Sequence, residues 1–198
     1  MANKPLIPPP EATLQALTDW LKAEKVPGLI IGGVAASLLG RPRFTQDVDA
    51  LISLDEEHWG RFLSAGNRFG FTPRISDAAD FARKSRVLLV QHRPTGIEVD
   101  IALAGLPFEE EAIRQVKRRK IGKLMLPLPT PENLIIMKAV AHRPQDMADI
   151  SALADANSKL DHRRIHRWVR EFSHALDMPD ILTDLEKILS DARKRKPR

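Results

Sequence analysis

Carboxylates at two places in the chain have the spacing of residues that hold metal ions. Asp47 and Asp49 are two positions apart, and so are Glu98 and Asp100. Side chains two positions apart in a β-strand project from the same face, so each pair is expected to present its carboxylates side by side. Neighbouring carboxylates repel each other, and burial makes this worse, so a folded protein keeps them where a cation neutralises them. Such hard oxygen ligands suit Mg²⁺.

The alternation of residues 97–103 favours Asp100 as a third carboxylate beside Asp47 and Asp49. Ile97, Val99, Ile101 and Leu103 share one apolar face, which leaves Glu98 and Asp100 on the other. Three carboxylates on two neighbouring strands could hold two divalent ions, which would bridge a nucleoside triphosphate and a hydroxyl nucleophile. Glu98 could take the place of Asp100, although we favour the aspartate.

Two features of the sequence, the strand at residues 45–53 and the glycine pair before it, are open to more than one interpretation. Residues 45–53 alternate as a strand, but it could be an exposed edge strand whose carboxylates pair with Arg41 or Arg43. Gly32 and Gly33 follow a short apolar strand and begin a helix, where free backbone N–H groups can bind an anion. Taken alone, that glycine pair is more often a tight turn than a phosphate site. Its spacing matches neither the dinucleotide fingerprint nor the P-loop.

These features together resemble a known superfamily. The segments Ile31-Gly32-Gly33 and Arg43-x-Thr45-x-Asp47-x-Asp49, followed by a later strand aspartate, are similar to polymerase-β-like nucleotidyltransferases. More narrowly, residues 32–49 resemble AbiEii-type toxin nucleotidyltransferases. A second block, residues 128–138 followed by Arg143-x-x-Asp146-x-x-Asp149, supports this resemblance. Gln145 stands where that family usually has a lysine.

The resemblance implies a role for each matching residue. Asp47 and Asp49 would hold the metal ions, and Asp100 would bind the catalytic metal and help to deprotonate the nucleophile. The remaining residues would serve the nucleotide: Gly32 and Gly33 would contact the triphosphate, Lys138 would bind phosphate, Asp146 would orient Lys138 or the base, and Arg43 and Thr45 would complete the nucleotide site. For Arg43, a salt bridge to Asp47 is an equal alternative.

The resulting prediction is a Mg²⁺-dependent nucleotidyltransferase, with two ions, that moves NMP from an NTP such as ATP to an acceptor hydroxyl. The resemblance favours RNA, and tRNA in particular, as the acceptor, and implies a toxin with a cognate antitoxin. A hydroxyl of a protein or of a small molecule is the alternative acceptor. A non-catalytic, antitoxin-like binding module is a further alternative, which the intact set of carboxylates opposes because an idle buried set would be costly.

The charge of the chain adds a local argument for RNA. The 31 basic side chains exceed the 26 acidic ones by five, and residues 193–198 hold five of the basic ones, so the rest of the chain is balanced. Residues 114–123 contain six basic residues and no acidic one. With no cysteine and no apolar run long enough to cross a bilayer, the chain is expected to be a soluble, cytoplasmic protein without a thiolate metal site.

The expected fold is α/β: a small mixed sheet with flanking helices, followed by a helical C-terminal region. Apolar spacing predicts helices at 11–26, 34–39 and 54–69, and a helix after Pro107 that closes with Lys117–Lys120. Strands are expected at 29–31, 45–53, 86–92, 97–103 and 123–128. Thr130 and Pro131 open a helix that continues to His142, and helices follow at 145–156, 161–175 and 179–192.

We divide the chain into three parts. Residues 1–130 form the catalytic core with its N-terminal helix, residues 131–192 form the helical region that completes the nucleotide and acceptor cleft, and residues 193–198 form a basic tail.

Overall fold

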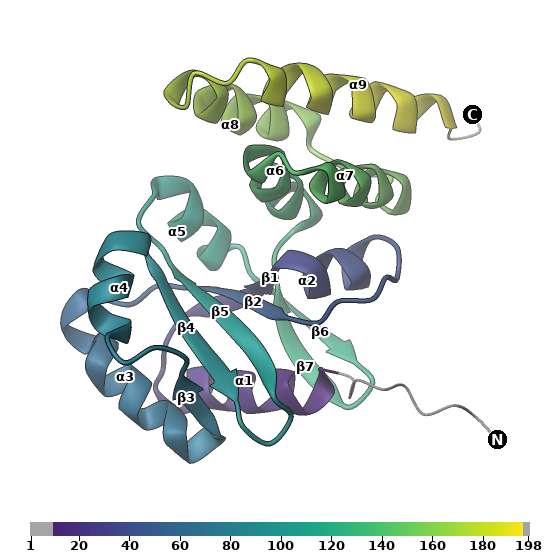
Figure 1. Cartoon of the computed structure of the whole chain (residues 1–198). Helices are drawn as coiled ribbons and strands as arrows, with labels where there is room; N and C mark the ends of the chain where they lie inside the picture. The colour runs from purple at the N-terminus through teal and green to yellow at the C-terminus, as the bar shows by residue number, and fades with distance from the viewer. Residues whose placement is uncertain (1–9, 196–198) are drawn as a thin grey trace. The chain divides into compact units, whose positions relative to one another are not determined.

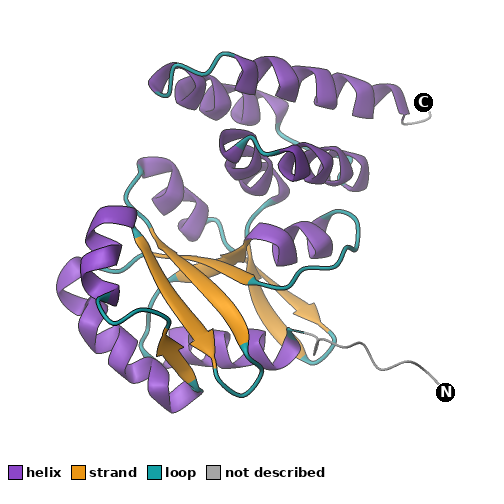
Figure 2. Cartoon of the chain, viewed as in Figure 1, coloured by secondary structure: helices purple, strands orange, loops and turns teal. Residues whose placement is uncertain are grey.

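The computed structural model describes residues 10–195, which divide into two compact units (Figure 1). The first unit contains the described residues up to Gly33 and residues Thr45–Leu128. The second contains Val34–Phe44 and the described residues from Pro129 onward. Figure 2 shows that the strands lie in the first unit and that the second consists of helices and loops. The expected α/β fold with a helical C-terminal region is confirmed.

A mixed five-stranded sheet forms the centre of the first unit. Its strand order is β1-β2-β5-β4-β3, with β2 and β5 parallel and the other neighbours antiparallel. The strands are β1 (Gly28–Ile31), β2 (Val48–Ile52), β3 (Phe71–Pro73), β4 (Val87–His92) and β5 (Ile97–Leu103). Because β2 lies between β1 and β5, it is not an edge strand, and the edge-strand interpretation of its aspartates is wrong.

Helices and aromatic packing support this sheet. The helices of the first unit are α1 (Glu11–Ala23), α3 (Trp59–Gly66), α4 (Ala78–Ser85) and α5 (Pro107–Arg114), with short 3₁₀ turns η1 (Glu56–His58) and η2 (Asn67–Phe69). Trp20 of α1 is fully buried and stacks on Phe62 and Phe71, with ring centroids 4.1 and 5.1 Å apart. Such stacked pairs stabilise a core beyond their buried area. They join α1 and α3 to β3.

The basic run after α5 differs from the prediction. It was expected to close a helix, but α5 ends at Arg114, and the run forms β6 (Lys117–Ile121), paired with β7 (Leu124–Leu128). Gly122 turns between them with φ +59°, a conformation that glycine adopts without strain. Leu126 and Leu128 of β7 are buried, so packing of this hairpin overrides the favourable match between basic residues and a helix dipole.

The second unit packs four helices with most of α2 (Gly32–Leu39), whose first two residues belong to the first unit. The four are α6 (Pro131–Ala141), α7 (Pro144–Ala156), α8 (His162–Ala175) and α9 (Asp180–Arg195). The expected cap of α6 is confirmed, because Thr130 Oγ1 accepts a hydrogen bond from the backbone N–H of Asn133 at 3.2 Å. No helix among residues 10–195 is long and apolar enough to cross a membrane.

Helix α9 includes the first part of the expected basic tail. It extends through Arg195, whose guanidinium pairs with Asp155 of α7 at 2.9 Å. Residues 196–198 lie outside the described residues. The segment at 193–195 is therefore helical and bound at its end, because an ion pair to α7 holds it.

Candidate active site

Asp49 and Asp100 lie side by side on neighbouring strands. Asp49 of β2 is in register with Asp100 of β5 across the parallel pair. In a parallel ladder, paired residues project from the same face. Val48, Ala50 and Val99 project from the opposite face and are fully buried, whereas Asp49 and Asp100 are partly exposed. The sheet thus brings together two of the three predicted metal-binding carboxylates.

Gly32 lies directly beneath Asp49. Ile31, the last residue of β1, is in register with Asp49, and the chain then turns into α2 at Gly32 with φ +62°. A Cβ atom at this position would be 1.8 Å from Asp49 Oδ2, which no side chain could accommodate without moving that carboxylate. Glycine is required here both for the left-handed backbone and for the close approach of the helix start to Asp49.

Replacing Gly32 should test this arrangement. Gly32→Ala introduces left-handed strain of about 1 kcal/mol and displaces Asp49, and a displacement of this size is expected to lower transfer activity about 100-fold. Gly96→Ala is the matched control, because Gly96 also has positive φ (+73°) but no atom within 4 Å of the added Cβ. Urea unfolding and turnover of both variants separate strain from clash. Equal activity in the two variants would contradict the proposed contact.

Asp47 lies just before β2 and is exposed, so the expectation that it lies inside the strand is wrong. Thr45 Oγ1 donates a hydrogen bond to Asp47 Oδ1 at 3.0 Å. Burial raises the pKa of Asp100 above its ordinary value, and the charges of Asp47 and Glu98 raise it further, although Arg74 opposes them. The Asp47 carboxylate is therefore close enough to Asp100 to repel it, so two of the three predicted metal-binding carboxylates interact through their charges.

Arg74 is the functional candidate that sequence reasoning missed. It follows β3, and its guanidinium donates hydrogen bonds to both Glu98 and Asp100. A fork of this kind suits two carboxylates on one strand face. Nothing in the sequence pattern indicates it, because β3 has three residues and includes a proline, and it was not among the expected strands.

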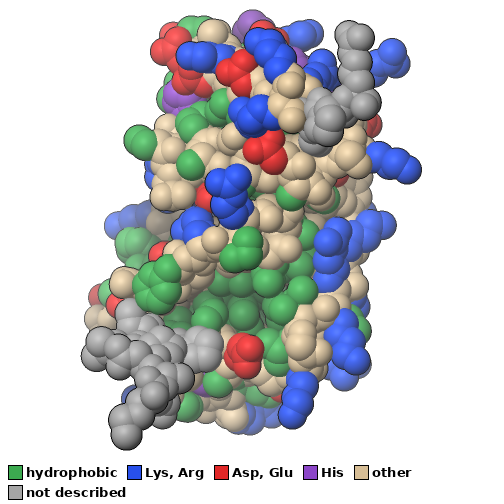
Figure 3. Space-filling view, turned by 90° about the vertical axis from the view of Figure 1, so that its right-hand side faces the viewer, with side chains coloured by type: hydrophobic (Ala, Val, Ile, Leu, Met, Phe, Trp, Pro, Cys, Tyr) green, Lys and Arg blue, Asp and Glu red, His purple; other side chains and the backbone are tan. Residues whose placement is uncertain are grey.

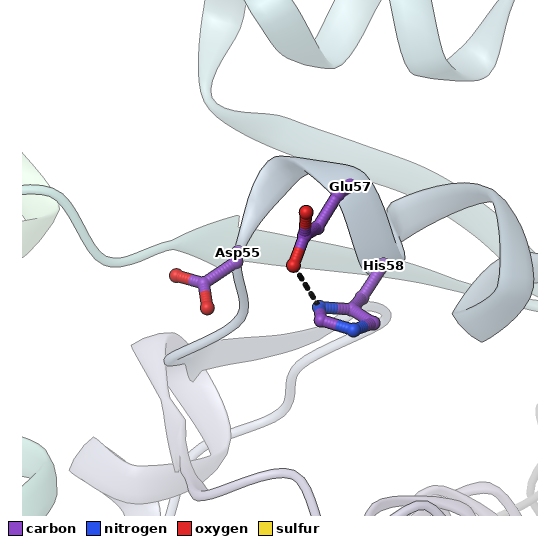
Figure 4. Close-up of side chains that lie close together, drawn as sticks. All are labelled: Asp55, Glu57 and His58. Carbon is purple, nitrogen blue, oxygen red and sulfur yellow. Dashed lines mark ion pairs between the residues drawn. The ribbon is translucent and has the colours of Figure 1, made fainter.

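The donor set fits a hard divalent cation. Asp47, Asp49 and Asp100 offer carboxylate oxygens, the ligand type of Mg²⁺. The pKa of Asp100 is raised mainly by burial, and the charge of Asp47 adds to this effect. A separate acidic group lies beyond the other end of β2, at Asp55, Glu57 and His58 (Figure 4). Its ligand atoms lie within 4.8 Å of one another, but the two acids are exposed, and exposed acidic groups commonly exist without an ion.

The other predicted nucleotide residues belong to the second unit, where they form a buried ionic network. Lys138 Nζ lies 2.8 Å from a carboxylate oxygen of Asp146 and 2.8 Å from one of Asp149. Arg43 pairs with Asp149 at 2.9 Å, so its predicted alternative partner, Asp47, is wrong. Arg143 pairs with Asp146 at 2.6 Å. Lys138 is only 4% exposed, and its ammonium is engaged by the carboxylates of Asp146 and Asp149.

This network predicts how stability depends on pH. Burial acts to raise the pKa of Asp146 and Asp149, but hydrogen bonds from Arg143, Arg43 and Lys138 outweigh it and hold both below the ordinary value of 3.8. A depressed folded pKa contributes stability above the unfolded value, which is lost as pH falls through the folded pKa. The urea midpoint should therefore fall as pH drops below about 4.

The control for this pH dependence is Asp146→Asn/Asp149→Asn, which lacks both carboxylates. Its urea midpoint should be lower at neutral pH and should depend less on pH below about 4. An acid transition of the same size in this variant would show that other carboxylates cause it.

Comparison with known proteins decides the family. Residues 11–187 match the model of the family described as "Nucleotidyl transferase of unknown function (DUF2204)". The chain belongs to this family. None of the curated proteins matches this DUF2204 member in sequence.

Solved structures share the fold of this nucleotidyltransferase. An antigenic nucleotidyltransferase-like protein from Paracoccidioides brasiliensis matches with a TM-score of 0.56 and 16% identity, over 89% of this chain and 91% of that one. The antibiotic-resistance factor ANT(2'')-Ia matches with a TM-score of 0.50 and 16% identity, over 93% and 92%. The lincosamide antibiotic adenylyltransferase LnuA matches with a TM-score of 0.50 and 15% identity, over 71% and 94%. At these identities the likeness concerns the fold.

Proposed function

We propose that this nucleotidyltransferase uses Mg²⁺ to transfer NMP from an NTP to an acceptor hydroxyl, with Asp47, Asp49 and Asp100 as the metal ligands. The observation that carries the proposal is the in-register placement of Asp49 and Asp100 on one sheet face, with the glycine turn at Gly32 beneath Asp49. Arg74 neutralises part of this charge, a divalent cation would offset the repulsion between Asp49 and Asp100, and the helix start at Gly32 can approach a phosphate.

The site residues of the first unit have separate roles in the proposed reaction. The acceptor oxygen bonds to the α-phosphorus of the NTP, the bond from that phosphorus to the bridging oxygen breaks, and pyrophosphate leaves. When bound, the metal ions neutralise charge on the phosphates and lower the pKa of the acceptor hydroxyl. Asp100 takes the hydroxyl proton. Arg74 orients Asp100 through its hydrogen bond, and Thr45 orients Asp47.

RNA is the acceptor that the surface of the first unit supports. Strand β6 presents four consecutive basic residues, Lys117, Arg118, Arg119 and Lys120, and all four are exposed. Successive residues of a strand point to opposite faces, so the strand offers cations on both sides. Lys and Arg side chains are visible on the face that Figure 3 shows. Phosphate groups of RNA are the natural partners of such a strand.

Label transfer tests the proposal and separates the acceptor classes. The full chain with Mg²⁺ is incubated with each α-labelled NTP in turn and with total RNA, with protein, or with an aminoglycoside or lincosamide. Label on RNA that disappears in the Asp49→Asn variant supports the proposal. Label on the small molecule or protein alone would overturn the RNA acceptor but keep the transferase. Absence of transfer to every acceptor would contradict the whole proposal.

The toxin role implied by the AbiEii-type resemblance stays a prediction. We propose to test it by inducible expression in bacteria, comparing the wild type with Asp49→Asn. Growth arrest that requires the intact carboxylate, and that a neighbouring gene product relieves, would support a toxin with a cognate antitoxin. Normal growth at high expression would contradict it.

A further inference from the structure

A cavity of about 540 Å³ opens between α8 and α9 of the second unit. Its lining includes four guanidinium groups: Arg163, Arg167 and Arg170 from α8 and Arg193 from α9. The three residues on α8 are spaced by four and then three positions, which places them on one face of the helix. The opposite face of α8, with Ile165 and Val169, is buried. The arginines therefore converge on the cavity because the apolar stripe fixes the orientation of α8.

The fold itself does not require these four charges. Within residues 10–195, none of the four arginines forms an ion pair with a carboxylate. Arg167 instead lies over the ring of Trp168, at 5.4 Å from its centroid. Glu171 is the acidic residue among the described residues that line the cavity. Four exposed guanidinium groups with one acid among them repel one another, so their arrangement indicates an anionic ligand.

The chemistry and dimensions of the cavity suit a chain of phosphate groups. A guanidinium offers a planar fork of N–H donors that matches a phosphate, and it is weakly hydrated. Arg163 and Arg170 are seven residues apart, about 10 Å along the helix axis, which is more than one phosphate spans. Arg167 packs over the ring of Trp168, but that ring is not among the residues that line the cavity, so recognition there rests on the phosphate groups.

We infer that this arginine-lined cavity binds the phosphate backbone of single-stranded RNA. The inference extends the RNA acceptor of the proposed function, but it concerns binding alone and does not depend on the carboxylates. The second unit would then have an RNA-binding surface of its own.

The test compares two triple variants of the full chain in binding to a labelled single-stranded RNA. Arg163→Gln/Arg167→Gln/Arg170→Gln removes the cluster and keeps good helix formers on exposed positions. Lys22→Gln/Arg61→Gln/Lys84→Gln makes the same charge change on exposed residues of α1, α3 and α4. Each lost phosphate contact should reduce the slope of log affinity against log salt by about 0.7. Between about 50 and 200 mM salt, the wild type should therefore lose about twentyfold more affinity than the cavity variant.

Three further binding measurements distinguish the possible outcomes. The Asp49→Asn variant should bind RNA as the wild type does, even if it transfers no nucleotide, so failure of the proposed reaction remains distinguishable. Equal RNA affinity and equal salt slopes in the two triple variants would overturn the inference. Binding of ATP or inorganic triphosphate as tight as RNA, and equally dependent on the cluster, would reassign the cavity to a small polyphosphate. Preference for poly-glutamate over RNA would reassign it to an acidic protein.

Discussion

Asp49→Asn and Asp100→Asn should each lower nucleotidyl transfer by at least about 10³-fold while leaving the fold intact. Loss of one preorganised group that stabilises transition-state charge costs about 10²–10³ in rate, and a metal-binding carboxylate also holds the cation that supplies the charge. Asparagine keeps the shape of aspartate, so the sheet register of β2 and β5 should persist. Rates are measured by pyrophosphate release at saturating NTP and Mg²⁺.

Glu98→Gln is the matched control for this prediction. Glu98 is on the same strand face as Asp100 and shares the guanidinium of Arg74, but its side chain is 56% exposed. Its rate should change less than about tenfold, because it acts through Arg74 and not on the substrate. If Glu98→Gln abolishes transfer and Asp100→Asn does not, then Glu98 is the third carboxylate. Full activity in both aspartate variants would end the proposal.

The Asp100→Asn variant should also differ from the wild type in thermal stability. The pKa of Asp100 is raised, which means that its ionised form is disfavoured in the folded state at neutral pH. A neutral isostere removes that penalty. Without metal, Asp100→Asn should therefore have an equal or higher thermal midpoint than the wild type. Added Mg²⁺ with NTP should raise the midpoint of the wild type and not that of the variant, because ligand binding to the native state stabilises it.

The carboxylate pair was predictable because two physical signals agree. Alternation of residues 97–103 fixes which face Asp100 occupies, and the apolar neighbours of Asp49 fix its own face. Strand pairing then follows from burying both apolar faces. Asp47 was placed wrongly, inside the strand, because alternation does not mark where a strand begins.

Other parts of the site could not be found this way. Arg74 reaches Asp100 because β3 pairs with β4. A strand of three residues is too short to be predicted from its sequence pattern, so this pairing could not be foreseen. The basic run of β6 fits a helix end as well as a strand, and only the packing of Leu126 and Leu128 decides it. Lys138 can be buried because it pairs with Asp146 and Asp149, which lie in the first and second turns of α7. A charged residue on an amphipathic pattern is ordinarily read as exposed.

Lys138→Met should destabilise the protein by about 3–5 kcal/mol, the cost of removing one partner from a buried ionic network. The substitution keeps the volume and apolar stem of the side chain but leaves Asp146 and Asp149 without their shared cation. Arg143 and Arg43 remain beside them, so unfolding need not be complete. The free energy of unfolding is measured by urea titration, with Lys187→Met on the exposed surface of α9 as the control, for which a change within about 0.5 kcal/mol is expected.

This result discriminates between two roles of Lys138. A lysine that contacts the triphosphate would weaken NTP binding by about 1.5–3 kcal/mol when removed and would leave folding nearly unchanged. A lysine that holds α6 to α7 should show the reverse, because its ammonium is engaged by two carboxylates before any nucleotide binds. The triple variant Lys138→Met/Asp146→Asn/Asp149→Asn should recover part of the lost stability, since it also removes the carboxylates left without their lysine. Unchanged unfolding of Lys138→Met together with weakened NTP binding would assign Lys138 to the phosphate after all.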